Sequence, residues 1–563
     1  MRPARTGWAL LVILALLLAA CAGQDPGSGP PPADQAAGGA DGDDDAQGPG
    51  TAAPDVPDPE PALAWGPTEA DLAQATERAA QMDEEDLAGQ VIIARYAGTD
   101  PASAAAMVAE YRLGGVILFA DNITSPDQVR HTAEAVQEAH EDLDRDWPAA
   151  VSVDNEGGLV QRMSGATGDW TTFPPFAAAG AAGDEAVVAG AMAAMARELR
   201  ASGVTMNFAP VADVSIGPQD PTINTRAAGS DPEVVSAAVT AAVEGFADGG
   251  VLSSLKHFPG HGALTVDSHE VLPVQPATGE ELTDRDLVPF RAGIEAGAPM
   301  VMMGHIAVDA WDEGVPATLS PQAYRILRED LGFTGVAITD GLDMGALTAT
   351  RTSGQIAVEA LAAGADLLLT PADTAGAHAA ILAALADGTL DRDRLVQAAG
   401  RVIALQRWQE QLAQASGPVD DEDVGTGAMA SQELSAAAIT LVAGPCEGPW
   451  LGQSVSVRGH TEADVAAFSQ AATAAGLQVT AAPEQAETSV VLLGGTGPMA
   501  GGDVAIALDG PWHLRGADAP TLIAAHGRTE HTMAALVEAL TQTGPPPGRL
   551  AFDVEDLPAQ ACP

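Results

Sequence analysis

Residues 251–262 read Val-Leu-Ser-Ser-Leu-Lys-His-Phe-Pro-Gly-His-Gly. The apolar run Val251–Leu255 has the length of a buried strand, and polar residues follow it at once. Pro259 and Gly260 exclude a helix here, so the run opens into a shaped loop that presents polar groups, Lys256 among them. A short apolar run followed by polar residues recurs along the chain, and this recurrence decides the fold.

Eight such runs lie in the middle of the chain. They are Val91–Ala94, Gly115–Phe119, Ala149–Val153, Val204–Phe208, Val251–Leu255, Met300–Met303, Val336–Thr339 and Asp366–Leu369. Helices are predicted at Pro126–Glu141, Glu185–Ala201, Pro232–Ala247, Arg285–Ala296 and Asp391–Leu412. Strands that alternate with helices indicate a parallel sheet. Eight units suit a (β/α)8 TIM-type barrel, whose usual size is roughly 250 residues plus insertions.

Polar residues stand at or just after the ends of five consecutive runs. They are Asp154–Glu156, Asn207, Lys256–His257, His305 and Asp340. Any one of them could be a satisfied polar residue at a strand end, but five in succession are poorly explained that way. Because the C-terminal strand ends of such a barrel face the active site, we expect one site built from these residues.

Lys256 is the only lysine of the chain, whose other basic residues are arginines. An ammonium group is a compact point charge and a guanidinium is a planar fork, so the retained lysine indicates a need for an ammonium. His257, His261 and His269 lie close by. Zinc binding is the rival interpretation of these histidines, but the Pro-Gly between the first two prevents the helical geometry of zinc motifs, and no metal is predicted.

Asp267 and His269 are the best candidates for acid–base chemistry. A carboxylate beside an imidazole orients it and raises its basicity, which suits proton transfer near neutral pH. The alternative is a pair of surface residues that never meet. Asp340 ends an apolar strand and suits a nucleophile toward an anomeric carbon. Its alternative is the N-cap of a helix.

Together these residues resemble glycoside hydrolase family 3, in its β-N-acetylglucosaminidase branch. The resemblance covers about Leu72 to Leu412 and is carried by 256–262, 267–269, Asp154–Arg162, Asn207–Val214 and Thr339–Asp340 with Met344. It implies the barrel fold, often followed by an α/β domain, and it implies no cofactor. The family's glucosidase branch takes its acid/base from a glutamate elsewhere, and the loop with His269 argues against that branch.

The resemblance also implies roles for individual residues. Asp340 matches the nucleophile, His269 the general acid/base, and Asp267 the residue that holds and charges His269. The residues matching those that grip a terminal N-acetylglucosamine are Asp154, Arg162, Arg226, Lys256 and His257. The family usually has an aromatic residue where this chain has Ala228, so the pocket wall is expected to differ there.

The chain has 563 residues and a net charge of −52, which argues against binding nucleic acid or an anionic membrane through surface charge. Residues 1–21 form a predicted signal peptide with a basic start and a short apolar core. Its end, Leu18–Cys21, resembles a bacterial lipobox, which implies a lipid on Cys21; ordinary secretion is the alternative. Residues 22–66 are rich in Gly, Pro and Asp and are predicted to be a disordered tether.

The barrel domain is predicted at 67–412, a linker at 413–428 and a smaller α/β domain at 429–563. Its expected strands are Ala438–Val442, Val455–Val457, Val479–Ala481, Val490–Leu493, Val504–Leu508, Leu522–Ala525 and Leu550–Val554, with helices at Thr461–Ala475 and Thr532–Thr541. Gly494–Gly497 lacks the lysine of a phosphate loop and is interpreted as a turn. Cys446 and Cys562 are the cysteines left in an exported chain once Cys21 is lipidated, which predicts a disulfide.

These expectations combine into one functional prediction. The chain is expected to be an exo-acting, retaining β-N-acetylhexosaminidase, a monomer held at the cell membrane by lipid and facing the cell wall. Its expected substrates are wall fragments with N-acetylglucosamine linked to N-acetylmuramic acid. The alternatives are a β-N-acetylglucosaminide phosphorylase, another family 3 β-glycosidase, and a non-catalytic sugar-binding lipoprotein. The intact Asp340, Asp267 and His269 argue against the last.

Overall fold

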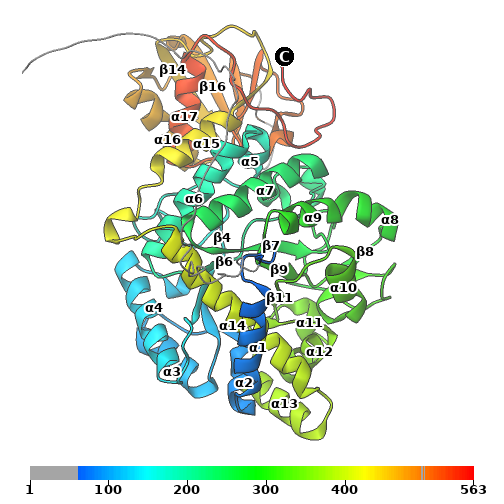
Figure 1. Cartoon of the computed structure of the whole chain (residues 1–563). Helices are drawn as coiled ribbons and strands as arrows, with labels where there is room; N and C mark the ends of the chain where they lie inside the picture. Colours follow the sequence, from blue (N-terminus) through cyan, green and yellow to red (C-terminus); the bar gives the residue numbers. More distant parts are fainter. Residues whose placement is uncertain (1–60, 496–498, 500, 563) are drawn as a thin grey trace, which may run out of the picture. The chain divides into compact units, whose positions relative to one another are not determined.

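The computed structural model describes residues 61–495, 499 and 501–562 (Figure 1). The predicted signal peptide, Cys21 and the tether up to residue 60 lie outside the described residues, as do Thr496 and Gly497 of the predicted turn. Residues 61–66 were expected in the tether, and this expectation is wrong. Trp65 is buried in the barrel core, and the Leu63 amide donates to the Pro67 carbonyl, because the indole supplies the apolar surface that the rest of the tether lacks.

The eight predicted runs form the eight strands of one closed parallel barrel, which confirms the predicted fold class. Around the ring the strands follow chain order, and the last, β12, pairs with the first, β1. Their bounds are β1 Ile92–Arg95, β2 Gly115–Leu118, β3 Ala150–Val153, β6 Met206–Asn207, β7 Leu252–Phe258, β9 Met300–Met303, β11 Val336–Gly341 and β12 Leu367–Leu369. Aliphatic side chains fill the interior, so the barrel is a packed core.

Helices separate the barrel strands, and their starts follow from capping residues. Ser125 and Asp231 accept hydrogen bonds from the first amides of α4 and α7, and a proline follows each cap at the first helical position. The helices of this part are α1 Glu69–Ala80, α2 Glu84–Gln90, α3 Pro101–Tyr111, α4 Pro126–Glu141, α5 Ala177–Ala182, α6 Glu185–Ala201, α7 Pro232–Gly249, α8 Gly279–Glu281, α9 Leu287–Glu295, α10 Pro321–Arg325, α11 Gly345–Thr348, α12 Ser353–Ala363, α13 Thr374–Asp387 and α14 Arg392–Ala415. Short strand pairs in the loops are β4 Asn155–Gly157 with β5 Val160–Gln161, and β8 Val274–Gln275 with β10 Ala307–Val308.

The C-terminal region forms a second, six-stranded sheet in the order β13-β18-β17-β16-β14-β15. Only β13 is antiparallel to its neighbour among these described strands. The bounds are β13 Thr440–Ala443, β14 Ser454–Gly459, β15 Gln478–Val479, β16 Thr488–Leu493, β17 Val504–Ala507 and β18 Thr521–Ala524, with helices α15 Ala428–Ala438, α16 Glu462–Ala474 and α17 Glu530–Thr541. This is the smaller α/β domain that the sequence predicts.

The expected strand at Leu550–Val554 is wrong. Its backbone bonds to the barrel part of the chain and not to the second sheet: the Ala551 carbonyl accepts from the Ser230 amide at 2.9 Å, and just before the segment the Arg549 amide donates to the Ala181 carbonyl in α5 at 2.9 Å. The apolar residues that suggested a strand are buried in the barrel core, with Phe552 only 3% exposed. The segment therefore ties the end of the chain to the barrel.

The segment expected as a linker, 413–428, is anchored to the barrel at several points. Helix α14 extends into it as far as Ala415, and the Asp423 carboxylate accepts from Arg197 at 2.8 Å. The Gly427 amide donates to the buried Glu198 carboxylate at 2.7 Å. Nowhere in the described part of the chain is a helix both long and apolar enough to cross a membrane.

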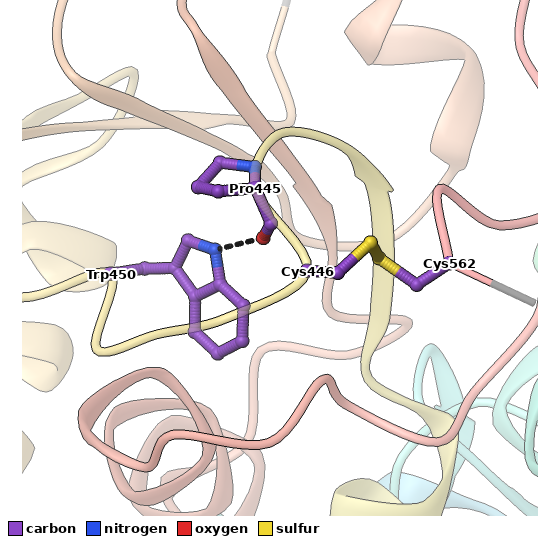
Figure 2. The surroundings of a disulfide bond; sticks show 4 residues. All are labelled: Pro445, Cys446, Trp450 and Cys562. Carbon is purple, nitrogen blue, oxygen red and sulfur yellow. Dashed lines mark hydrogen bonds between the residues drawn. A yellow bond between two sulfur atoms is a disulfide. The ribbon is translucent and has the colours of Figure 1, made fainter.

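Cys446 and Cys562 are joined by a disulfide with a Cα–Cα distance of 5.8 Å (Figure 2). The bond links the loop after β13 to the end of the chain. Trp450, in the same loop, donates from its indole nitrogen to the Pro445 carbonyl at 3.0 Å, which braces the loop that carries Cys446.

Candidate active site

A cavity of about 250 Å³ opens at the C-terminal ends of the barrel strands. The residues predicted to carry the chemistry or to bind sugar line this cavity, except Asp267, which bonds to a lining residue: they are Asp154, Arg162, Arg226, Lys256, His257, His269 and Asp340. Glu156, Asn207 and His305, which were also expected at the site because they follow strand ends, are not among the lining residues. Four hollows are larger, at about 900, 920, 470 and 730 Å³, and none of them is lined by a residue of a barrel strand. They lie away from the strand ends, so the smaller cavity is the candidate active site.

Lys256 lies fully inside the barrel, near the end of β7. Its ammonium contacts Asp154 Oδ1 at 2.7 Å and Glu156 Oε1 at 2.6 Å, and only 2% of its side chain is exposed. Burial alone would lower the pKa of Lys256, but the two carboxylates outweigh it and raise that pKa, so the ammonium stays charged. The lone lysine thus supplies a fixed positive charge beside the cavity.

Arg226 forms a bidentate pair with Glu156. Its Nε and Nη2 donate to the two carboxylate oxygens at 2.8 Å each. Burial would raise the pKa of Glu156, but Arg226 and Lys256 overcome this and hold it at about 2. The sequence placed Glu156 in the polar motif with Asp154 but indicated no role for it. The sequence feature that could have indicated a role is its position two residues after Asp154 and directly before Gly157-Gly158.

Asp213 is the second residue that the sequence analysis did not select. One of its oxygens contacts His257 Nδ1 at 2.7 Å, and the other accepts from the amides of His257 and His261 at 3.2 and 2.6 Å. Burial acts to raise the pKa of Asp213, but the two histidines outweigh it and lower that pKa. Asp213 therefore fixes the His257 ring, whose Nε2 lies 3.5 Å from Arg226 Nη2. The sequence feature that could have identified Asp213 is its place directly after the apolar pair Val211-Ala212.

Asp340 lies near the end of β11 and faces the cavity. Burial would raise its pKa, but His257, His305 and the Gly341 amide, which donates to Oδ1 at 2.7 Å, hold the pKa of Asp340 at about 2. The carboxylate is therefore ionised at any ordinary pH. Asp340 is not the N-cap of the following helix, since that position belongs to Met344. An ionised carboxylate in a small cavity suits a nucleophile.

His305 ends the sixth run but has a structural role. Its Nδ1 contacts Thr318 Oγ1 at 2.7 Å, and its Nε2 contacts the Gly341 carbonyl at 2.8 Å. It thereby braces the backbone next to Asp340.

Asp267 and His269 meet in the loop after β7. Asp267 Oδ1 accepts from the His269 amide at 2.9 Å and contacts His269 Nδ1 at 2.8 Å. Burial raises the pKa of Asp267, but the His269 amide and ring overcome this and lower it. The His269 side chain is 62% exposed, and in the described part of the chain no hydrogen bond to its Nε2 competes with a substrate. The pair can therefore exchange a proton with a ligand or with water.

His257, His261 and His305 each contact another protein side chain through a ring nitrogen. His261 Nε2 contacts Ser268 Oγ at 3.0 Å, and burial lowers the pKa of His261 to about 4, with His257 adding to the effect. Among the described residues, no group of three or more His, Cys, Asp or Glu side chains is placed to hold a metal ion.

A family model described as "Glycosyl hydrolase family 3 N terminal domain" matches residues 76–405. Beta-hexosaminidase A of Pseudoalteromonas piscicida is 34% identical over 291 residues, which is 48% of each chain, so this chain spans about half of that relative. A beta-hexosaminidase of Methylococcus capsulatus is 38% identical over 279 residues, 49% of this chain and 80% of the relative.

A solved structure agrees with these sequence matches. The family 3 beta-N-acetylglucosaminidase of Paenibacillus sp. str. FPU-7 superposes with a TM-score of 0.73 at 28% identity, covering 84% of this chain and 99% of that one. The similarity extends over both the barrel and the second sheet, because 84% of the chain exceeds the barrel alone.

Proposed function

The chain belongs to glycosyl hydrolase family 3, and we propose that it is an exo-acting, retaining β-N-acetylhexosaminidase that removes terminal β-linked N-acetylglucosamine. One observation carries this proposal: an ionised carboxylate, Asp340, and an exposed carboxylate–imidazole pair, Asp267–His269, serve one small cavity. A retaining glycosidase needs a nucleophile and a separate acid/base.

In the first step of this mechanism, Asp340 attacks the anomeric carbon and forms a glycosyl-enzyme, while His269 gives a proton to the departing oxygen. In the second step His269 takes a proton from water, which attacks the anomeric carbon and releases Asp340. Asp267 holds the imidazole through Nδ1 and stabilises its charged form. Each step inverts the configuration of the anomeric carbon, so the two steps together retain the β configuration.

The sugar would be held by the charged groups of the cavity wall. Arg162 lines the cavity, and its buried Nε has no hydrogen-bond partner among the described residues. Asp154, Arg226, Lys256 and His257 line the same wall, so charged donors and a carboxylate acceptor can meet sugar hydroxyls. The small volume fits one terminal sugar, which supports exo action.

The proposed natural substrates are cell-wall fragments in which N-acetylglucosamine is linked to N-acetylmuramic acid. The support is the N-terminal sequence: Leu18-Ala19-Ala20-Cys21 resembles a lipobox, and a lipid on Cys21 with a long tether would hold the enzyme at the membrane, facing the wall. Mass spectrometry of the mature N-terminus tests this part. A lipid-modified Cys21 is expected, and an unmodified N-terminus elsewhere would contradict it.

The activity itself is tested with a nitrophenyl N-acetyl-β-glucosaminide, with and without phosphate. We expect hydrolysis independent of phosphate, with the β anomer of N-acetylglucosamine appearing first by NMR. Release of a sugar phosphate that depends on added phosphate would identify a phosphorylase. Binding of N-acetylglucosamine without any turnover would identify a sugar-binding protein, and either result would overturn the proposal.

A further inference from the structure

The second domain contacts one particular part of the catalytic face. Residues 215–230, here termed the Arg226 segment, form the long loop after β6 and supply Thr222, Ile223 and Arg226 to the cavity wall. The segment is folded on itself. The Asp220 carboxylate accepts from the amides of Thr222, Ile223 and Asn224 at 2.9 to 3.0 Å.

The base of the Arg226 segment is closed by one backbone bond, since the Ser215 amide donates to the Gly229 carbonyl at 3.0 Å. The Ile216 amide also donates to the Gly262 carbonyl at 2.9 Å, and Arg226 is held by Glu156. Two further points of support are the turn near Gly217 and the end near Ser230. Trp512 of the second domain contacts the first point, and residues 551–553, here termed the C-terminal extension, contact the second.

The indole of Trp512 covers the turn. A Cβ atom at Gly217 would lie 3.7 Å from Trp512 Cε3 and Cζ3, which is ordinary van der Waals contact. Trp512 itself packs edge-on against Phe552, with ring centroids 5.6 Å apart, and Phe552 is buried in the barrel core. Trp512 thus forms a wall that rests on the barrel and faces the turn.

The C-terminal extension holds the other end. The Ser230 amide donates to the Ala551 carbonyl at 2.9 Å, and the Asp553 amide donates to Ser230 Oγ at 2.8 Å. A Cβ at Gly229 would lie 2.4 Å from the Ala551 carbonyl oxygen, so the two backbones are as close as they can come.

We infer that Trp512 is a positioning residue for substrate binding: with the Ala551–Asp553 strap it holds the Arg226 segment so that Arg226 meets both Glu156 and the bound sugar. This rests on the proposed function. Arg226 would contact the sugar in the ground state and the transition state alike, so a displaced segment weakens binding more than it slows the chemical step.

Trp512→Ala in the full chain tests the inference. We expect the KM for the nitrophenyl substrate to rise roughly tenfold while kcat changes by less than about threefold. Trp512→Phe keeps an aromatic wall and should restore most of the binding. Ser230→Ala removes the Asp553 contact, leaves the core intact and should shift KM in the same direction by less.

Trp450→Ala is the matched control, because Trp450 lies in the core of the same domain and braces the disulfide loop without touching the Arg226 segment. It should lower the melting temperature and leave KM unchanged. If Trp450→Ala raised KM as much as Trp512→Ala, general destabilisation would explain the effect and the inference would fail.

Amide hydrogen exchange separates this inference from the proposed function, since it needs no substrate. Peptides that cover residues 215–230 should exchange faster in folded Trp512→Ala than in the wild type or Trp450→Ala. Unchanged exchange and unchanged KM in both folded Trp512→Ala and folded Ser230→Ala would overturn the inference. A wild-type enzyme without hexosaminidase activity would instead overturn the proposed function alone.

Discussion

At the scale of the residue, the site is a set of buried charges that are nearly balanced. Lys256 touches two carboxylates, and Arg226 grips one of them with two parallel bonds. The ammonium contacts two acceptors from different residues, which a planar fork matches poorly, and this explains the single lysine in an arginine-rich chain. Removing one partner would leave an uncompensated buried charge.

The sequence predicted the residues that face the cavity better than those behind them. Asp340 directly follows the predicted apolar run Val336–Thr339, and His269 lies two residues from a carboxylate in a polar loop, and both signals can be found in the sequence. Glu156 and Asp213 contact other side chains of the site, and a pattern of strands and loops carries no information about such contacts. They required the three-dimensional structure, although both lie beside predicted positions.

The Asp267–His269 pair predicts a dependence on the leaving group. His269→Ala should slow hydrolysis of a natural disaccharide far more than that of an activated aryl glycoside, because a nitrophenolate departs without a proton. With the aryl substrate, azide should restore turnover and give a β-glycosyl azide. Asp267→Asn should change both rates in the same direction as His269→Ala but by less, because the imidazole remains and loses only its charged partner.

The kinetics of both substrates and the identity of the azide product check this prediction. An equal loss on both substrates, with no response to azide, would mean that His269 binds or braces and that the acid lies elsewhere.

At the scale of the element, the barrel strands were predictable from the sequence, and the packing of residues 550–554 was not. The eight barrel runs are apolar, short and followed by polar residues, and all became strands. Leu550–Val554 is equally apolar, yet it packs into the barrel core. Local sequence shows that such a segment is buried, but the choice between two available apolar surfaces is made by tertiary packing.

The disulfide fixes the end of that segment to the second domain. Its cysteines are 116 residues apart, so replacing both with serine should cost about 4 to 5 kcal/mol of unfolding free energy in the chain-entropy model. Urea unfolding of Cys446→Ser/Cys562→Ser measures the loss, and reduced wild-type protein is its control.

Thiol labelling of unfolded, unreduced protein checks the bond directly. Neither Cys446 nor Cys562 should react. Labelling of both would show that the link is absent.

At the scale of the whole molecule, the alternation of strands and helices was sufficient for the barrel and the second sheet, because each unit must bury its apolar face in a layered architecture. Buried histidines add a dependence of global stability on pH. Burial lowers the pKa of His140 to about 3 and that of His526 to about 4, well below their values in the unfolded chain.

The unfolded chain therefore binds more protons than the folded chain between about pH 6.5 and 4, so stability falls as the pH drops through this window. Each such histidine should contribute about 1.4 kcal/mol per pH unit. Urea unfolding at pH 7, 6 and 5 measures the slope, above the range in which exposed carboxylates protonate.

His140→Leu is the matched variant, since neither ring nitrogen of His140 has a hydrogen-bond partner among the described residues. Its slope between pH 6 and 5 should be smaller by about 1.4 kcal/mol per unit. An unchanged slope would show that His140 is not buried in its neutral form.

The mechanism depends on Asp340 as the nucleophile, and trapping the glycosyl-enzyme identifies that residue. A 2-deoxy-2-fluoro glycoside with a good leaving group should trap the glycosyl-enzyme, and peptide mass mapping should find the sugar on Asp340. Asp340→Ala should fold, bind sugar, lose nearly all turnover and remain unlabelled. A trapped sugar on any other carboxylate of the wild-type enzyme would show that Asp340 is not the nucleophile.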